Sequence, residues 1–207
     1  MKTMLRAAIS TDVFDYLTLS AALAEYRNVR TKIGRLLAAG EIIRIKKGLY
    51  CFPEALRRAP LEPAVVANMI YGPSYVSCDY ALSYYGLIPE RVELVTSMTT
   101  GHPKVFQTPV GQFLYYQRHS ADYSIGITMQ ESKSGNFLIA SPEKALYDKA
   151  QTDPRFNGLE IQNYLEEDLR IEPEQLQGLD AAVWKQLEGT ATGRMRKLVQ
   201  FFLEAKR

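Results

Sequence analysis

The most constraining feature of this sequence is a helix-like stretch that leads directly into a short hairpin, between residues 28 and 52. Apolar side chains recur in it at the i, i+4, i+7, i+8 spacing of one buried helical stripe. These side chains are Val29, Ile33, Leu36 and Leu37. Gly40 suits the end of such a helix. The letters GEIIRIKKGLYCF (40–52) then predict two strands that turn at Lys47-Gly48, where glycine permits a positive φ.

Two more helices are predicted before this unit, from apolar side chains at helical spacing. The first carries Met4, Leu5, Ala8 and Ile9, and the second carries Leu19, Ala22, Leu23 and Tyr26. Thr18 or Ser20 is the expected N-cap of the second helix. The third runs from about residue 28 to residue 39. Three short helices followed by a hairpin predict a winged helix-turn-helix domain over residues 1–56.

The charge of the chain is divided unevenly between its two parts. Residues 1–58 hold eleven Lys and Arg against five Asp and Glu, a net charge of +6. The remainder holds fourteen against eighteen, a net charge of −4, so the chain as a whole carries only +2. A basic first part predicts a polyanionic partner for that part alone.

The third helix has the side chains that a DNA-recognition helix needs. Projected at 100° per residue, Asn28, Thr31 and Arg35 lie opposite the apolar stripe, with Gly34 near them, and Arg30 and Lys32 flank the stripe. Arg and Asn can each make two hydrogen bonds to a base edge in the major groove. Between Arg27 and Gly40 there are four cations and no acid, which is unusual for an ordinary solvated helix face. A solvated face is nevertheless the alternative interpretation.

The hairpin extends the same surface. Strict alternation directs Ile43 and Ile45 to one face and Arg44 and Lys46 to the other, with Lys47 at the tip. These cations would meet a phosphate backbone or a minor groove, although lysines on a short hairpin can also serve only to protect a sheet edge. The expected double-stranded DNA contacts are therefore Arg27, Asn28, Arg30, Thr31, Lys32, Arg35, Arg44, Lys46 and Lys47.

A linker is predicted at residues 57–63, RRAPLEP, because its two prolines interrupt helix and strand alike. Beyond it, residues 64–207 predict a larger α+β domain with a mostly antiparallel sheet and a helical C-terminal tail. The strand-like runs are VELVTSMT (92–99), KVFQT (104–108), GQFLYYQ (111–117), YSIGITMQE (123–131) and NFLIA (136–140). A helix is expected over SCDYALSYYG (77–86). Another should begin at Ser141, with Pro142 at its first position.

A search for catalytic and metal-binding patterns returns one weak candidate. Glu131-Ser132-Lys133 has the ExK form of restriction-type nucleases, and Asp122 lies upstream. An uninterrupted strand would hold Asp122 and Glu131 about 30 Å apart, too far to share a metal. His102 and His119 lack metal-ligand spacing, and Cys51 and Cys78 lack a partner motif. We therefore expect no catalytic residues, no metal and no cofactor.

Nothing in the sequence predicts a membrane span or a signal peptide, so a cytoplasmic location is expected. Buried free thiols in a reducing compartment fit this expectation.

Four segments of the second part resemble the antitoxin of type IV toxin–antitoxin systems, the abortive-infection AbiEi family. They are ALSYYGLIPE (81–90), VTSMTTG (95–101), FQTPVGQFLYYQ (106–117) and ASPEKALYD (140–148). The resemblance also covers the N-terminal hairpin. It implies a transcriptional repressor that binds inverted repeats upstream of its own operon and counteracts a nucleotidyltransferase-like toxin, without a stable complex being required. It associates neutralisation of the toxin, and oligomerisation on DNA, with the larger second domain, and it brings no catalytic residues.

A second interpretation remains open. The tyrosine-rich stretches YALSYYG (80–86) and FLYYQ (113–117) are the kind that line an aromatic pocket. The chain would then be a winged-helix regulator whose second domain senses a small molecule.

Overall fold

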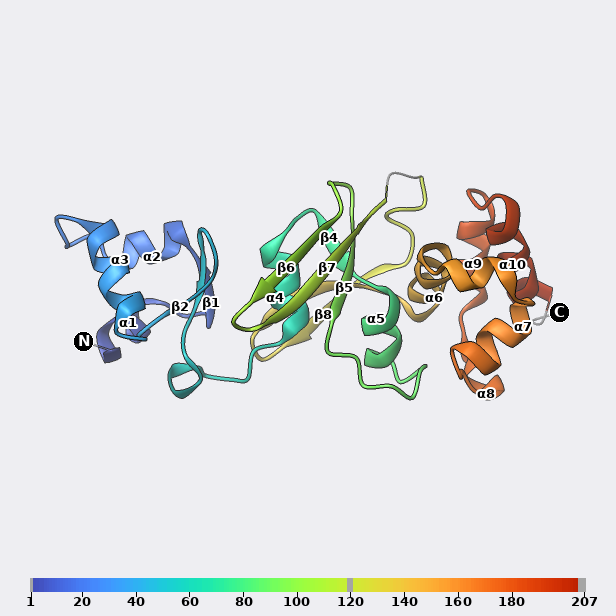
Figure 1. Cartoon of the computed structure of the whole chain (residues 1–207), viewed down its shortest axis with the longest axis horizontal. Helices are drawn as coiled ribbons and strands as arrows, with labels where there is room; N and C mark the ends of the chain where they lie inside the picture. The colour runs from blue at the N-terminus through green and yellow to red at the C-terminus, as the bar shows by residue number, and fades with distance from the viewer. Residues whose placement is uncertain (1, 119–120, 205–207) are drawn as a thin grey trace.

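The computed structural model describes residues 2–118 and 121–204 and forms an elongated α+β molecule (Figure 1). The first helices and a small sheet occupy one end, a larger sheet lies in the middle, and the last helices occupy the other end. The two ends of the chain therefore lie at opposite ends of the molecule. None of the described helices is long and apolar enough to cross a lipid bilayer.

The N-terminal unit has three helices and a three-stranded antiparallel sheet of order β1-β3-β2. Its elements are α1 (Lys2–Ala8), β1 (Val13–Asp15), α2 (Tyr16–Ala22), α3 (Val29–Ala38), β2 (Ile43–Lys46) and β3 (Leu49–Cys51). The predicted N-cap of α2 was wrong. Asp15 holds that place and accepts a hydrogen bond from the Thr18 N–H at 2.8 Å, since α2 begins directly after strand β1.

The apolar stripe of α3 packs as predicted. Ile33 and Leu36 are buried in a cluster that also contains side chains of α1, α2 and one face of the small sheet. Gly40 follows the helix with φ +64°, and Gly48 turns the hairpin with φ +85°. Both glycines therefore adopt the left-handed conformation that their places require.

The larger sheet has six strands in the order β6-β7-β5-β4-β9-β8. Its strands are β4 (Ser74–Val76), β5 (Val95–Thr99), β6 (Lys104–Thr108), β7 (Gly111–Gln117), β8 (Ile127–Ser132) and β9 (Gly135–Ala140). As predicted, most of its strand pairs are antiparallel: β4–β5, β6–β7 and β8–β9. The sheet is nevertheless mixed, because the pairs β5–β7 and β4–β9 are parallel.

Helices cover both faces of the larger sheet. Tyr115 lies in register with Ser97 and Val76 and donates to the Ala67 carbonyl of α4 (Pro63–Ile70) at 2.6 Å. Tyr75, one residue from Val76 and therefore on the opposite face, reaches α6 (Pro142–Thr152) instead. Helix α5 (Cys78–Tyr84) packs against α6. Ser141 caps α6 with Pro142 at the first position, as predicted.

The helical tail is broken into short pieces. They are a 3₁₀ turn (Pro154–Gly158), α7 (Ile161–Asn163), a π-helical turn (Tyr164–Asp168), α8 (Pro173–Gly178), α9 (Ala181–Glu188) and α10 (Gly193–Glu204). Trp184 of α9 and Phe202 of α10 stack with ring centres 4.3 Å apart, and both are buried. This pair fixes the last two helices to each other.

The two predicted domains share a hydrophobic cluster. One face of the small sheet packs toward the larger domain and joins its core through Val13, Ile45, Leu49 and Cys51. The predicted linker is also held at both ends. The buried Asp12 carboxylate accepts the N–H groups of Arg58 and Ala59, and the Glu62 N–H donates to Ser134.

Candidate nucleic-acid interface

A cleft of about 650 Å³ opens between α3 and the β2–β3 hairpin. It is lined by Tyr16, Arg30, Ile33, Gly34, Arg44, Lys47, Gly48 and Tyr50. Three of these described residues are cations and none is acidic. A cleft lined by one sign of charge attracts counter-charged ligands, because its low-dielectric walls focus the field. The cleft brings together three predicted DNA contacts, Arg30, Arg44 and Lys47.

Tyr16 also lines this cleft, and sequence reasoning did not select it. Hydrogen bonds from Ser20 and then from Arg30 lower the pKa of the Tyr16 hydroxyl. Tyr16 is 37% exposed at the first position of α2, directly after the Asp15 cap. The hydroxyl therefore helps to hold the Arg30 guanidinium at the wall of the cleft. A tyrosine directly after an Asp N-cap was the only available signal.

Gly34 lies on the cleft wall, and nothing lies within 4 Å of the position that a Cβ would take there. Packing inside the protein therefore does not explain this glycine. A helix-interior glycine costs about 1 kcal/mol relative to alanine. The free space leaves room for the backbone of a ligand to approach α3 closely.

The remaining predicted contacts of the third helix are exposed but lie outside the cleft lining. Arg27, Asn28, Thr31 and Arg35 all face solvent. Asn28 is the N-cap of α3, and its Oδ1 accepts the Thr31 N–H at 3.1 Å. Its side-chain oxygen is thus engaged in holding the helix, so any base contact by Asn28 would rely on its amide nitrogen.

Lys32 is placed differently from the prediction. It is 9% exposed, and its ammonium lies 4.8 Å from the centre of the Tyr26 ring. It lines a separate hollow with residues of α1 and α2, rather than the cleft beside the hairpin. The helical projection correctly put Lys32 at the edge of the apolar stripe, but that edge is covered by neighbouring elements.

The predicted alternation along β2 holds for Ile43, Arg44 and Ile45 and fails at Lys46. The register shifts between Arg44 and Lys46, so that Arg44 lies opposite Tyr50 while Lys46 lies opposite Leu49. Adjacent residues of β3 face opposite sides of the sheet, so Arg44 and Lys46 do too. Arg44 lies 5.9 Å from the Tyr50 ring on the cleft side. Lys46 donates to the Ile70 carbonyl of α4 in the larger domain.

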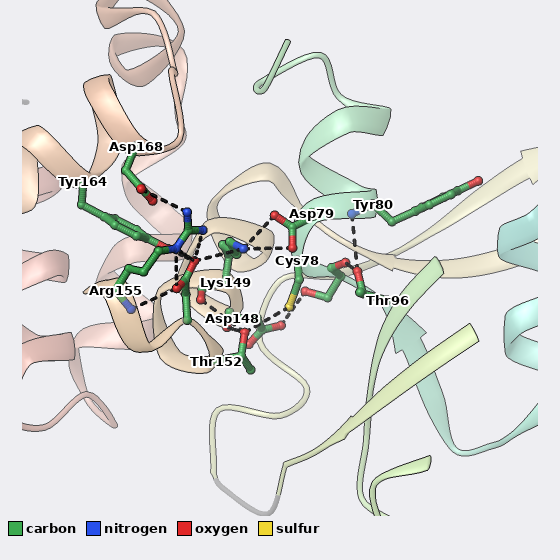
Figure 2. A network of polar contacts seen from close by, with 12 residues as sticks. Cys78, Asp79, Tyr80, Thr96, Asp148, Lys149, Thr152, Arg155, Tyr164 and Asp168 are labelled. Atoms are coloured by element: carbon green, nitrogen blue, oxygen red, sulfur yellow. Dashed lines mark hydrogen bonds and ion pairs between the residues drawn. The ribbon is translucent and has the colours of Figure 1, made fainter. Parts of the chain in front are cut away.

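A second set of polar side chains joins α5 to α6 and the turns after it (Figure 2). Lys149 lies 2.8 Å from Asp79 and 3.1 Å from Asp153. Arg155 binds Asp153 at 2.5 Å and Asp168 at 3.1 Å. Although burial raises the pKa of the Asp153 carboxyl, the hydrogen bonds from Arg155 and Lys149 outweigh it and hold that pKa well below its usual range. Each of the two cations pairs with two of the three carboxylates, so every charge in the network has a partner and the network fits a structural role.

The residues of the nuclease-like pattern do not form a site. Asp122 is buried in a pair with Arg118, whose Nε lies 3.2 Å from Oδ1, and it lies before β8. Glu131 lies near the other end of β8 and is exposed. Over residues 2–118 and 121–204, no three His, Cys, Asp or Glu side chains are grouped so that they could hold a metal ion. His119 lies outside the described residues.

Comparisons with known proteins show the fold only. No model of a known protein family matches the chain, and no curated protein matches it either. The fold is similar to that in the crystal structure of the RV2827C protein from Mycobacterium tuberculosis, with a TM-score of 0.61 and 13% sequence identity. The match covers 98% of this chain and 74% of that one. The α+β architecture is therefore shared along nearly the whole length.

Proposed function

We propose that the N-terminal unit is a winged helix-turn-helix domain that binds double-stranded DNA. The order helix, strand, helix, helix, strand, strand supports this proposal, with α3 as the recognition helix and the β2–β3 hairpin as the wing. The observation that carries the proposal is the cleft between them, where Arg30, Arg44 and Lys47 converge beside the open backbone of Gly34. Phosphate contacts would come from these cations and base contacts from α3.

We further propose that the chain is a transcriptional autorepressor and the antitoxin of a type IV toxin–antitoxin system. This rests on the four segments that resemble the AbiEi family. Two of them form ordered structure around one core, since Leu82 and Leu87 of the first and Leu146 of the last are all buried. The partners would be the inverted repeats upstream of its own gene and a nucleotidyltransferase-like toxin, with a cytoplasmic location.

The DNA half of the proposal is tested by the salt dependence of binding to the DNA directly upstream of the gene. Each phosphate contact contributes about 0.9 to the slope of log K against log[salt]. Replacing Arg44 and Lys47 by Ala together should therefore reduce the slope by about 1.8. Lys185→Ala on α9, at the other end of the molecule, is the matched control and should change nothing. An unchanged slope in the double variant would remove the wing from the interface.

The antitoxin half is tested by co-expression with the neighbouring open reading frame. We expect that frame alone to arrest growth and the intact chain to restore it. Arg44→Ala/Lys47→Ala should still restore growth, because neutralisation is assigned to the larger domain. A harmless neighbour would contradict the antitoxin role and leave DNA binding unaffected.

A second candidate function has one observation in its favour. A hollow of about 660 Å³ at the start of β5 and β7 is lined by Tyr80 and Tyr84 of the YALSYYG stretch, together with Arg91 and Gln112. Rings with a few polar groups are typical of small-molecule sites. A compound that raises the melting temperature of the intact chain, but not of Tyr84→Ala, would support a ligand-sensing regulator.

A further inference from the structure

We propose that Lys46 is a positioning residue, which ties the β2–β3 hairpin to the larger domain and so holds Arg44 and Lys47 in place for nucleic acid. The attachment of the hairpin through Lys46 consists of contacts within the protein. Its consequence for binding rests on the proposed function.

The bulge in β2 gives Lys46 its direction. Regular alternation along β2, with no bulge, would put Lys46 on the same face as Arg44, beside the cleft. With it, Lys46 shares the face of Leu49, which packs against the larger domain. Two cations separated by one residue therefore serve opposite sides of the same small sheet.

The partners of Lys46 come from two elements of the larger domain. Its ammonium donates to the carbonyl of Ile70, the last residue of α4, and lies 6.0 Å from the centre of the Phe106 ring in β6. The last carbonyls of a helix lack partners within the helix, and the helix dipole favours a cation there. Among the described residues, Lys46 forms no ion pair. Burial, followed by the nearby charge of Lys104, lowers the pKa of Lys46.

The surroundings give the tie a fixed anchor. The ring centres of Phe106 and Tyr71 lie 6.1 Å apart, and the Lys104 ammonium lies 4.5 Å from the centre of the Tyr71 ring. Apolar contacts through Ile45, Leu49 and Cys51 continue the same junction. These contacts have no preferred direction along the surface, whereas a hydrogen bond to one carbonyl fixes a position. Lys46 therefore sets the position of the hairpin at a junction whose remaining contacts are apolar.

The native thiols offer a direct measure of this junction. Cys51 is fully buried on the junction face of β3, and burial raises the pKa of its thiol. Cys78 is equally buried but belongs to the interior of the larger domain, which makes it an internal control. Lys46→Met keeps the length of the side chain and removes the donor. Lys47→Met makes the same change at the exposed tip of the hairpin.

The experiment compares both variants with the full-length wild-type chain by thiol labelling, with the labelled cysteine assigned by mass spectrometry. We expect Lys46→Met to label Cys51 about tenfold faster than the wild type, because a charge-assisted hydrogen bond no longer opposes opening. Cys78 should be unaffected. Lys47→Met should label like the wild type. Lys46→Arg, which keeps the charge and the donors, should restore protection.

The same variants are then titrated with a DNA duplex of random sequence. Lys46→Met should bind about threefold more weakly at an unchanged salt slope, since only the fraction of correctly placed hairpins is reduced. Lys47→Met should lose about 0.9 from the slope. A slope reduced by Lys46→Met with Cys51 still protected would overturn the proposal, because Lys46 would then be a phosphate contact. Wild-type labelling in Lys46→Met would overturn it too. If the wild type binds no duplex, the proposed function fails. The labelling rates still show whether Lys46 attaches the hairpin to the larger domain.

Discussion

Lys144 and Asp148 face each other one turn apart on α6, with the ammonium 3.1 Å from the carboxylate, and both side chains are completely buried. Tyr75 and Ser77 donate to the same Asp148 carboxylate at 2.9 and 2.8 Å, and Lys144 donates to the Asp122 carbonyl. The charged side chains of the SPEKALYD segment thus lie inside the protein. This segment carries much of the family resemblance, and its charged residues therefore serve the interior of the protein rather than a partner surface.

Lys144→Met should destabilise the protein by about 3 kcal/mol in urea denaturation, because it leaves the Asp148 charge buried without its counter-charge. Lys144→Met/Asp148→Leu should lose less than the single variant, since no unpaired charge remains. A single variant within about 1 kcal/mol of wild type would show that the hydrogen bonds from Tyr75 and Ser77 alone satisfy Asp148.

Asp153 should make the protein sensitive to acid. Its pKa is held below the usual value in the folded chain, so the unfolded chain binds a proton there first. The stability that this network contributes is present above about pH 4 and is lost as the pH falls below that value. The unfolding free energy of Asp153→Asn should therefore change less between about pH 5 and pH 3 than that of the wild type. Glu131→Gln on the exposed part of β8 should keep the wild-type profile.

Asn28 combines a capping role with a proposed base contact, and two variants separate these roles. Asn28→Ala should cost about 1 kcal/mol of stability, whereas Asn28→Ser retains a capping oxygen and most of that stability. Both remove the amide nitrogen proposed to contact a base, so both should weaken binding to the specific site more than binding to random DNA. Wild-type affinity in Asn28→Ser, measured on upstream DNA, would restrict Asn28 to capping.

Gly34→Ala tests how closely a ligand approaches α3. The added methyl group meets no atom within 4 Å, so thermal unfolding should show a gain of up to about 1 kcal/mol. We expect the same variant to bind DNA more weakly, because the methyl group occupies space needed by the sugar-phosphate backbone. Greater stability with unchanged affinity would show that the ligand stays clear of this wall.

Several elements could be predicted from the sequence because their patterns are long and local. Strands β6 and β7 coincide with KVFQT and GQFLYYQ, and α6 begins at its expected cap. Strands β1 and β4 were missed because three residues are too few to display alternation. Their identity as strands depends on their partners in the sheets.

The residues of the candidate site also divide into those that a local pattern predicts and those whose role depends on partners elsewhere in the chain. Arg30, Arg44 and Lys47 were found from charge and periodicity and do line one cleft. Lys46 was assigned to the wrong face because alternation presumes an uninterrupted ladder, and a bulge is set by the pairing of two strands. Tyr16 was missed because its role depends on a side chain fourteen positions away.

The bulge at Ile45 also separates the roles of the two cations in β2. Because two residues of β2 lie opposite Leu49, Arg44 stays opposite Tyr50 on the cleft side while Lys46 keeps its hydrogen bond to the end of α4. A substitution at position 44 can therefore change the charge of the cleft without loosening the hairpin, and a substitution at position 46 can loosen the hairpin without removing a cation from the cleft.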